Sequence, residues 1–208
     1  MTAMEREVKQ IAGWILAGGA SSRMGRAKAL LEIGGEPVIV RTARLVEAVV
    51  GSATVVGGLG EYENLGLWVI EDDVRDAGPL GAIATALRVS NAPWNLILAC
   101  DLPHLTREWL QFLVQRALTS QADAVLPINA RGAEPLCAAY HKCGEPLIRT
   151  AIERGVRKVT DGLQELRIET IEPAEWKAFD SEGFLFKNMN SPEDYEEAKA
   201  RSERRAPN

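Results

Sequence analysis

The chain has 208 residues, of which 46% are hydrophobic and 25% charged, and its formal net charge is −5. This balance is typical of a soluble globular protein and argues against one that coats nucleic acid or binds an anionic membrane. No apolar run approaches the roughly 20 residues that a membrane span requires. The charged N-terminus lacks a signal-peptide core, and three cysteines without CxxC spacing favour reduced thiols in the cytoplasm.

Five apolar, β-branched runs predict the strands of a sheet. They are residues 11–17, 53–57, 67–71, 94–100 and 123–128. Most of these runs are continuously apolar and do not alternate with polar residues. Strands that are covered on both faces have this character, and such strands are usually parallel.

Segments with helical periodicity follow most of these strands. They are residues 37–50, 78–90, 106–118 and 191–200. Pro37 and Pro79 suit a first helical turn, and Thr106 and Ser191 suit N-caps. The alternation predicts an α/β fold with a doubly wound, mostly parallel sheet in three layers, which binds ligands at the carboxyl ends of its strands.

One domain is expected to occupy residues 1–208. A single core is ordinary at this length, and no internal repeat or long linker divides the chain. The ends, residues 1–10 and 202–208, are expected to fray, and the basic residues of the tail ARSERRAPN are expected to be solvated.

A glycine-rich, basic stretch follows the first predicted strand. It contains Gly18, Gly19 and Gly25 together with Arg23 and Lys28. Glycines let backbone N–H groups approach a bulky anion, and guanidinium and ammonium groups bind phosphate oxygens. The spacing is neither that of a Walker A loop nor that of GxGxxG. We expect a loop that binds a triphosphate; the alternative is an exposed surface loop.

Carboxylates follow two further strands of the predicted sheet. Asp101 ends the run 94–100, and one or two carboxylates with substrate phosphates commonly hold Mg²⁺; the alternative is that Asp101 caps the next turn. Asp72 or Asp73, after the run 67–71, is placed to contact a ribose or base; the alternative is an acidic turn before a helix. Because the carboxyl ends of parallel strands share one edge, these acids are expected to face the glycine-rich stretch.

Two further features are weaker candidates. Arg154, Arg157 and Lys158 form a basic cluster that is either a second anion site or a solvated helix end. His104 and His141 have no serine or cysteine partner pattern, so neither is expected to act as a catalytic base.

The glycine-rich stretch and its neighbours resemble a known signature. LAGGASSRMGRAK, residues 16–28, is similar to the motif Leu-Ala-Gly-Gly-x-Ser-x-Arg-Met-Gly-x-x-Lys of nucleotidyltransferases that activate phosphorylated small molecules. Within that superfamily the chain most resembles the molybdenum cofactor guanylyltransferases. Supporting stretches at similar spacing are residues 69–83, 100–105, 131–142 and 186–198, so the resemblance covers roughly residues 11–200.

The resemblance implies a Rossmann-like, GT-A-like fold and a defined reaction. The enzyme would transfer GMP from GTP to the terminal phosphate of molybdopterin cofactor, release pyrophosphate and form the guanine dinucleotide, with Mg²⁺ or Mn²⁺ as cofactor. Its partners would be GTP, molybdopterin cofactor and proteins that supply or receive this cofactor, with no nucleic acid and no membrane.

The resemblance also implies roles for residues of this chain. The loop that receives the nucleotide is matched by Leu16, Ala17, Gly18 and Gly19, and the phosphate-binding cations are matched by Arg23 and Lys28. Asp72 matches a nucleotide-contacting acid, and Asp101 matches the magnesium ligand. The residues near the metal and phosphates are matched by Asn188 and Asn190, and a basic region facing the pterin is matched by Arg157 and Lys158. Arg23, Lys28 and Asp101 are therefore the expected catalytic residues. No general base is expected, because a phosphate with a second pKa of roughly 6 is already ionised at neutral pH.

One departure and three alternatives accompany this interpretation. Where some relatives have an asparagine, this chain has Gly57, so a side-chain contact to the nucleotide is lost there. The alternatives are a CTP-dependent cytidylyltransferase, a nucleotidyltransferase of sugar or isoprenoid precursors, and a non-catalytic nucleotide-binding adaptor. The LAGG and GPLGA stretches favour GTP, and the joint presence of Arg23, Lys28 and Asp101 favours catalysis.

Overall fold

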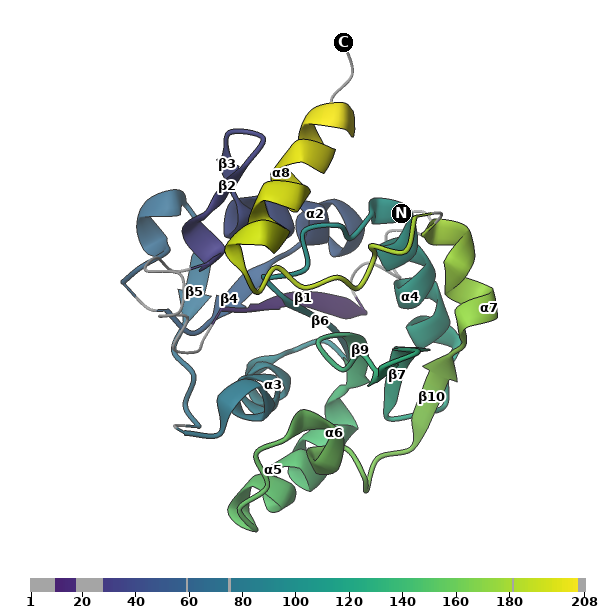
Figure 1. Ribbon diagram of the computed structural model, residues 1–208. Coiled ribbons are helices and arrows are strands. Elements are labelled where there is room, and N and C mark those ends of the chain that lie inside the picture. The colour runs from purple at the N-terminus through teal and green to yellow at the C-terminus, as the bar shows by residue number, and fades with distance from the viewer. Residues whose placement is uncertain (1–9, 18–27, 59, 75, 181, 206–208) are drawn as a thin grey trace, which may run out of the picture.

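A computed structural model describes residues 10–17, 28–58, 60–74, 76–180 and 182–205 (Figure 1). The described residues form an eight-stranded sheet in the order β10-β7-β9-β6-β1-β4-β5, with β8 paired to β7, and a separate two-stranded sheet of β2 and β3. The strands are β1 (Ile11–Leu16), β2 (Glu32–Ile33), β3 (Glu36–Pro37), β4 (Thr54–Val56), β5 (Trp68–Ile70), β6 (Trp94–Ala99), β7 (Ala124–Asn129), β8 (Gly132–Ala133), β9 (Cys137–His141) and β10 (Ile168–Ile171).

The central strands are parallel, as their continuous apolar runs predict. β1 pairs in parallel with both β6 and β4, and β4 pairs in parallel with β5. All six residues of β6 are buried, which is why its sequence shows no polar alternation. The prediction of an α/β fold with a mostly parallel sheet is confirmed, and the five predicted strands correspond to β1, β4, β5, β6 and β7.

Three strands of the main sheet, β8, β9 and β10, were not anticipated from the sequence. β9 runs antiparallel between β6 and β7, and β10 pairs in parallel with β7 at the sheet edge. The sequence of β9, CAAYH, is short and contains two alanines, which have low β propensity. Its first four residues are nevertheless buried, because the strand fills the space between two longer neighbours.

Helices cover both faces of the sheet and give the predicted three layers. They are α2 (Val38–Val50), α3 (Gly78–Val89), α4 (Arg107–Thr119), α5 (Glu145–Glu153), α6 (Val159–Gly162), α7 (Pro173–Trp176) and α8 (Pro192–Arg205), with short 3-10 helices at Lys28–Leu30, Glu63–Leu65, Lys142–Gly144 and Lys177–Phe179. α2 and α4 pack on one face, and α3, α5 and α6 pack on the other (Figure 1). Among the described helices, none has the length and apolar character to cross a bilayer.

The helix starts use the predicted residues with one exception. The Thr106 hydroxyl accepts a hydrogen bond from the backbone N–H three residues on at 3.3 Å. Ser191 and Asp194 cap the start of α8 reciprocally, and Pro79 lies in the first turn of α3. Pro37, predicted in the first turn of its helix, is instead the residue before α2, because it ends the small strand β3.

The C-terminal helix is longer and better anchored than the sequence predicts. α8 continues to Arg205, so it includes residues 202–205, whose expected fraying stays a prediction. Arg201 is not solvated either: its side chain is 11% exposed and pairs with Glu182. Its guanidinium carbon lies 3.7 Å from the centre of the Phe184 ring, where the negative face of the aromatic ring attracts a cation. The helix is thereby fixed to the segment that precedes it.

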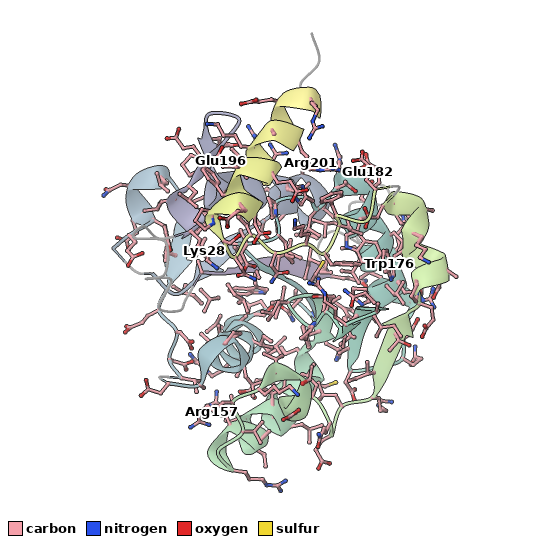
Figure 2. All side chains as sticks on the ribbon, in the orientation of Figure 1. Lys28, Arg157, Trp176, Glu182, Glu196 and Arg201 are labelled. Carbon is pink, nitrogen blue, oxygen red and sulfur yellow. The ribbon has the colours of Figure 1, made fainter. Side chains whose placement is uncertain are left out.

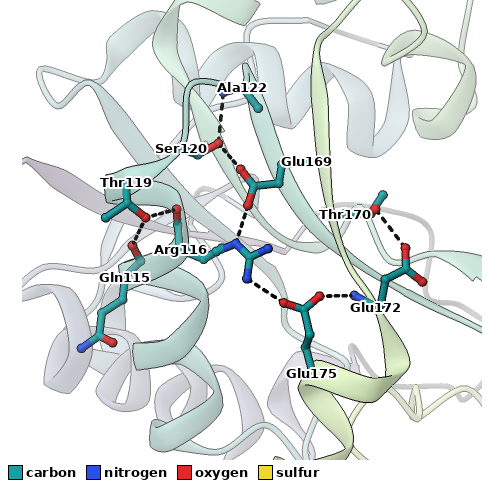
Figure 3. Close-up of polar contacts among 9 residues, drawn as sticks. All are labelled: Gln115, Arg116, Thr119, Ser120, Ala122, Glu169, Thr170, Glu172 and Glu175. Carbon is teal, nitrogen blue, oxygen red and sulfur yellow. Dashed lines mark hydrogen bonds and ion pairs between the residues drawn. The ribbon is translucent and has the colours of Figure 1, made fainter.

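A charged cluster joins α4 to β10 and α7 (Figure 3). Arg116 on α4 donates hydrogen bonds to Glu169 on β10 and, at 2.6 Å, to Glu175 on α7. Ser120 donates to Glu169 at 2.5 Å, and this bond together with Arg116 holds the pKa of Glu169 below its ordinary value. The cluster fastens the edge strand, which β7 and β9 separate from β6.

Candidate active site

The carboxyl ends of β1 and β6 define the candidate site. Leu16 at the end of β1 pairs with Ala99 of β6 and with Val56 of β4. The Ala17 N–H extends this pairing by donating to the Val56 carbonyl at 3.1 Å. The stretch that follows β1 and the Asp101 carboxylate that follows β6 therefore leave the sheet from adjacent strands, as the prediction requires.

Lys28 and Asn190 meet although 162 positions separate them in the chain. Lys28 opens the first 3-10 helix, and its Nζ donates a hydrogen bond to Oδ1 of Asn190 at 2.7 Å. Asn190 is itself held by α8, since its backbone N–H donates to the Asp194 carboxylate at 3.0 Å. An ammonium has three N–H donors. One amide contact fixes its direction and leaves donors for phosphate oxygens.

The Asp101 carboxylate is buried near Lys28 and is incompletely hydrogen-bonded. Among the described residues, its buried Oδ1 has no hydrogen-bond partner. Burial raises the pKa of Asp101, and the positive charge of Lys28 opposes that rise. A buried acceptor without a donor costs roughly 1–3 kcal/mol, so this oxygen suits a site that a bound cation completes. The alternative that Asp101 only caps a turn does not explain why Oδ1 is buried without a hydrogen-bond donor among the described residues.

A metal at this point would depend on its substrate for ligands. The described residues contain no cluster of three or more His, Cys, Asp or Glu side chains placed to hold an ion. Mg²⁺ commonly binds through one or two carboxylates, with water and substrate phosphates as its other ligands. A single orphaned carboxylate oxygen at the edge of a nucleotide-binding sheet fits that pattern.

The segment before α8 brings two asparagines to this edge. The Met189 N–H donates to the Asp101 carbonyl at 2.9 Å, and the Met189 side chain is buried in a small apolar cluster with residues of β2, α2 and α8. On one side of this anchor Asn190 reaches Lys28, and on the other Asn188 lines a pocket. The structure therefore brings together the predicted Lys28, Asp101, Asn188 and Asn190.

A pocket of about 260 Å³ lies on the β9 side of this arrangement. Its lining residues are Ala99, Leu102, Glu134, Pro135, Leu136, Lys158, Val159, Thr160 and Asn188. The walls are mainly apolar, and they carry one carboxylate, one ammonium, one hydroxyl and one amide. Lys158 was predicted here, whereas Glu134 was missed. The available signal was an acid directly before Pro135, where the chain enters a buried strand.

Asp72 is engaged within its own turn. Its Oδ1 accepts the Val74 N–H at 3.0 Å and lies 2.8 Å from the hydroxyl of Thr85 on α3. These contacts stabilise the entry to α3 and correspond to the acidic turn that the sequence left as the alternative. A nucleotide contact by Asp72 stays a prediction.

Gly57 lies just after β4 and has a backbone that explains its identity. Its φ is 91°, and its N–H donates to the Ile70 carbonyl at 2.9 Å. Glycine adopts positive φ without penalty, and asparagine tolerates it better than most residues. The positive φ therefore accounts for glycine at this position.

The two basic residues expected to face the pterin separate in the structure. Arg157 donates to two backbone carbonyls at the end of α5, at 3.0 and 2.9 Å. It is absent from the described lining of the pocket, which includes Lys158. Figure 2 shows Arg157 beside α5 and Lys28 near the start of α8. For Arg157 the helix-end alternative describes its contacts.

Part of the predicted site lies outside the described residues. Gly18, Gly19, Arg23 and Gly25 belong to the stretch 18–27, so their placement is not described. Their roles in binding the nucleotide stay predictions.

The fold and the placed side chains define a class of protein. A lysine held by an asparagine, a carboxylate whose buried Oδ1 has no hydrogen-bond partner among the described residues, and an adjacent pocket lie near the carboxyl ends of neighbouring parallel strands. Doubly wound sheets bind nucleotides at this edge. This arrangement is typical of nucleotide-binding α/β proteins.

Comparison with known proteins narrows this class. The chain belongs to the MobA-like NTP transferase family, whose domain model matches residues 13–168. A probable molybdenum cofactor guanylyltransferase of Pelotomaculum thermopropionicum is 32% identical, covering 93% of this chain and 94% of that protein. One from Synechococcus elongatus is 35% identical, covering 80% and 96%. The crystal structure of molybdopterin-guanine dinucleotide biosynthesis protein A from Archaeoglobus fulgidus has a TM-score of 0.81 at 24% identity and covers 93% of this chain and 99% of that one. The predicted family and enzyme class, nucleotidyltransferase, are confirmed.

Proposed function

We propose that this chain is a molybdenum cofactor guanylyltransferase that transfers GMP from GTP to the terminal phosphate of molybdopterin cofactor. Support comes from the family, from the names of its relatives, and above all from the Asp101 carboxylate near Lys28, whose buried Oδ1 has no hydrogen-bond partner within the described part of the chain. The reaction brings two polyanions together, so its main requirement is charge neutralisation in a partly dry site.

In this proposal Lys28 binds the triphosphate. The Asn190 amide orients its ammonium, and Arg23, outside the described residues, supplies a second cation. As the bond between the α-phosphorus and the bridging oxygen breaks, charge accumulates on pyrophosphate. Preorganised donors that meet this charge lower the barrier.

Asp101 would hold Mg²⁺, or Mn²⁺ in its place, through Oδ1, with Asn188 and Asn190 nearby. When bound, the ion neutralises phosphate charge and orients the reacting groups. Asp101 itself supplies a fixed negative charge at the end of a rigid, fully buried strand, which limits where the ion and its phosphates can lie.

Proton transfer needs no side chain in this mechanism. A phosphate oxygen of the acceptor attacks the α-phosphorus, a P–O bond forms, and the bond to the pyrophosphate oxygen breaks. The acceptor phosphate is already largely ionised at neutral pH, since its second pKa is roughly 6.

The acceptor is proposed to enter the pocket of about 260 Å³ that Lys158 and Asn188 line. The Lys158 side chain is exposed and its ammonium lies 3.4 Å from a carboxylate oxygen of Asp161, and this cation suits an anionic group of the incoming cofactor. Proteins that deliver molybdopterin cofactor or receive the dinucleotide are proposed partners, and the cytoplasm is the proposed location.

Pyrophosphate release tests this function directly. Purified protein is incubated with Mg²⁺, molybdopterin cofactor and each of GTP, CTP, ATP and UTP in turn. Turnover with GTP alone is expected. Turnover with CTP alone would instead identify a cytidylyltransferase, and tight nucleotide binding without turnover would identify an adaptor.

A further inference from the structure

The pocket beside Asp101 combines features that suit a flat heterocycle. Its apolar walls come from β6, from the segment before β9 and from α6, and its polar side chains are few. Such pockets usually hold a ring between apolar surfaces and fix its orientation through a few polar groups. Glu134 is the carboxylate among those groups.

Glu134 is held in place while one of its oxygens stays available. Its Oε1 accepts a hydrogen bond from Asn129 Nδ2 at 2.5 Å and lies 3.7 Å from an Arg131 nitrogen. Its backbone is fixed by a bond from its N–H to the Pro127 carbonyl at 2.9 Å. The side chain is 18% exposed. Within the described part of the chain its side-chain contacts use Oε1, which leaves Oε2 for a ligand.

We propose that Glu134 selects the acceptor by accepting hydrogen bonds from the adjacent ring and amino N–H groups of its 2-amino-4-oxopyrimidine edge. This inference rests on the proposed function and names the residue that recognises the ring. An ionised carboxylate only accepts hydrogen bonds, and two neighbouring N–H donors match that chemistry.

Guanine carries a similar edge, so the position of Glu134 in the sheet decides which ring it meets. The predicted nucleotide loop follows β1, whereas Glu134 precedes β9, and β6 with Asp101 lies between these strands. The pocket therefore lies on the β9 side of β6, whereas β1, which precedes the predicted GTP loop, pairs with β6 on its other side. This placement assigns Glu134 to the acceptor.

The test compares Glu134→Gln with wild type in steady-state kinetics with Mg²⁺-GTP and molybdopterin cofactor. Glutamine keeps the shape but turns one acceptor into an NH₂ donor, which opposes the donors of the ring. We expect the KM for the acceptor to rise on the order of 10- to 100-fold, as for loss of a charge-assisted hydrogen bond. The KM for GTP is expected to change less than about twofold.

A matched control separates recognition from stability. Glu169→Gln removes a partly buried carboxylate from the Arg116 cluster at the far edge of the sheet, and it is expected to lower the melting temperature without changing the acceptor KM. Glu134→Asp retains the charge and is expected to fall between wild type and Glu134→Gln. If a variant loses acceptor binding only because it unfolds, its melting temperature falls as well, so the two causes can be told apart.

Competition by ring analogues gives a second readout. Pterin-6-carboxylate carries the 2-amino group, and lumazine-6-carboxylate has an oxygen there. Wild type is expected to be inhibited more strongly by the pterin, and Glu134→Gln is expected to lose that preference. An unchanged acceptor KM in Glu134→Gln, or a rise in the GTP KM alone, would overturn the inference. Failure of wild type to turn over would instead overturn the proposed function.

Discussion

Lys28 Nζ donates to Oδ1 of Asn190 at 2.7 Å, and this contact links the 3-10 helix Lys28–Leu30 to the segment before the last helix. The amide carries no charge, so it directs the ammonium without neutralising it. A carboxylate in the same place would compete with phosphate for the lysine.

The contact between Lys28 and Asn190 predicts that mutations of these two residues lower kcat in a non-additive way. Lys28→Ala is expected to lower kcat by on the order of 10²-fold, because a donor that meets developing charge is lost. Asn190→Ala is expected to lower it about 10-fold, because the ammonium is retained but less well oriented. In a double-mutant cycle Asn190→Ala is expected to add little to Lys28→Ala, since its effect requires the lysine. Lys199→Ala, an exposed change on α8, is the control. Simple additivity of the two losses would contradict this coupling.

Asp101→Asn is expected to abolish most turnover while leaving the fold at least as stable. Because burial raises the pKa of Asp101 above the ordinary 3.8, ionisation is less favourable in the folded chain. Its contribution to stability is therefore greatest below pH 3.8 and is lost as pH rises through the folded pKa. A neutral amide avoids this loss. Melting temperature at pH 7 and the Mg²⁺ dependence of the rate check the prediction, with exposed Glu153→Gln as the control. A variant that keeps near wild-type turnover would show that Asp101 is not the metal ligand.

Asp123 predicts acid sensitivity that is separate from catalysis. Arg167 donates to Asp123 from Nη2 at 2.7 Å, from Nε at 3.1 Å and from its backbone N–H at 3.0 Å, and these bonds hold the pKa of Asp123 well below its usual range. The stabilisation is present above the ordinary carboxyl pKa of 3.8 and is lost as pH falls toward the folded value. Asp123→Asn is expected to cost about 1–2 kcal/mol at pH 7, a range that allows for the exposed guanidinium. Urea unfolding should show the gap to wild type closing between pH 5 and about pH 2; a constant gap would be inconsistent with this ion pair.

Arg201→Ala is expected to destabilise the chain although it lies near the C-terminus. The change removes the contact with Phe184 and the pairing with Glu182, and it leaves that carboxylate without this cation. A loss of about 1–2 kcal/mol in unfolding free energy is expected, in line with a partly desolvated cation–π contact. Lys199→Ala on the exposed side of the same helix should lie within about 0.5 kcal/mol of wild type. Equal stability of the two variants would contradict a stabilising role for Arg201 and would favour the solvated tail that the sequence predicts.

Local chemistry in the sequence determined the central strands and most helix starts, and it indicated which residues are proposed to bind phosphate and a cation. A buried parallel strand needs a continuous apolar run. A helix start needs a side chain that accepts hydrogen bonds from the unpaired N–H groups of the first turn, and a triphosphate-binding loop needs cations beside glycines. These requirements are met by neighbours in sequence, so Lys28 and Asp101 could be named as candidates before the fold was known, and their roles stay predictions.

Only the tertiary structure decided contacts between distant segments. β9 with its weak propensity is buried because β6 and β7 flank it. Arg201 is largely buried, with Phe184 lying against it, and Glu134 lines a pocket that four separate segments build. Arg157 and Lys158 are neighbours in sequence, yet one caps a helix and the other lines that pocket. Burial and the direction of a side chain depend on which segments pack together, and no local pattern specifies that packing.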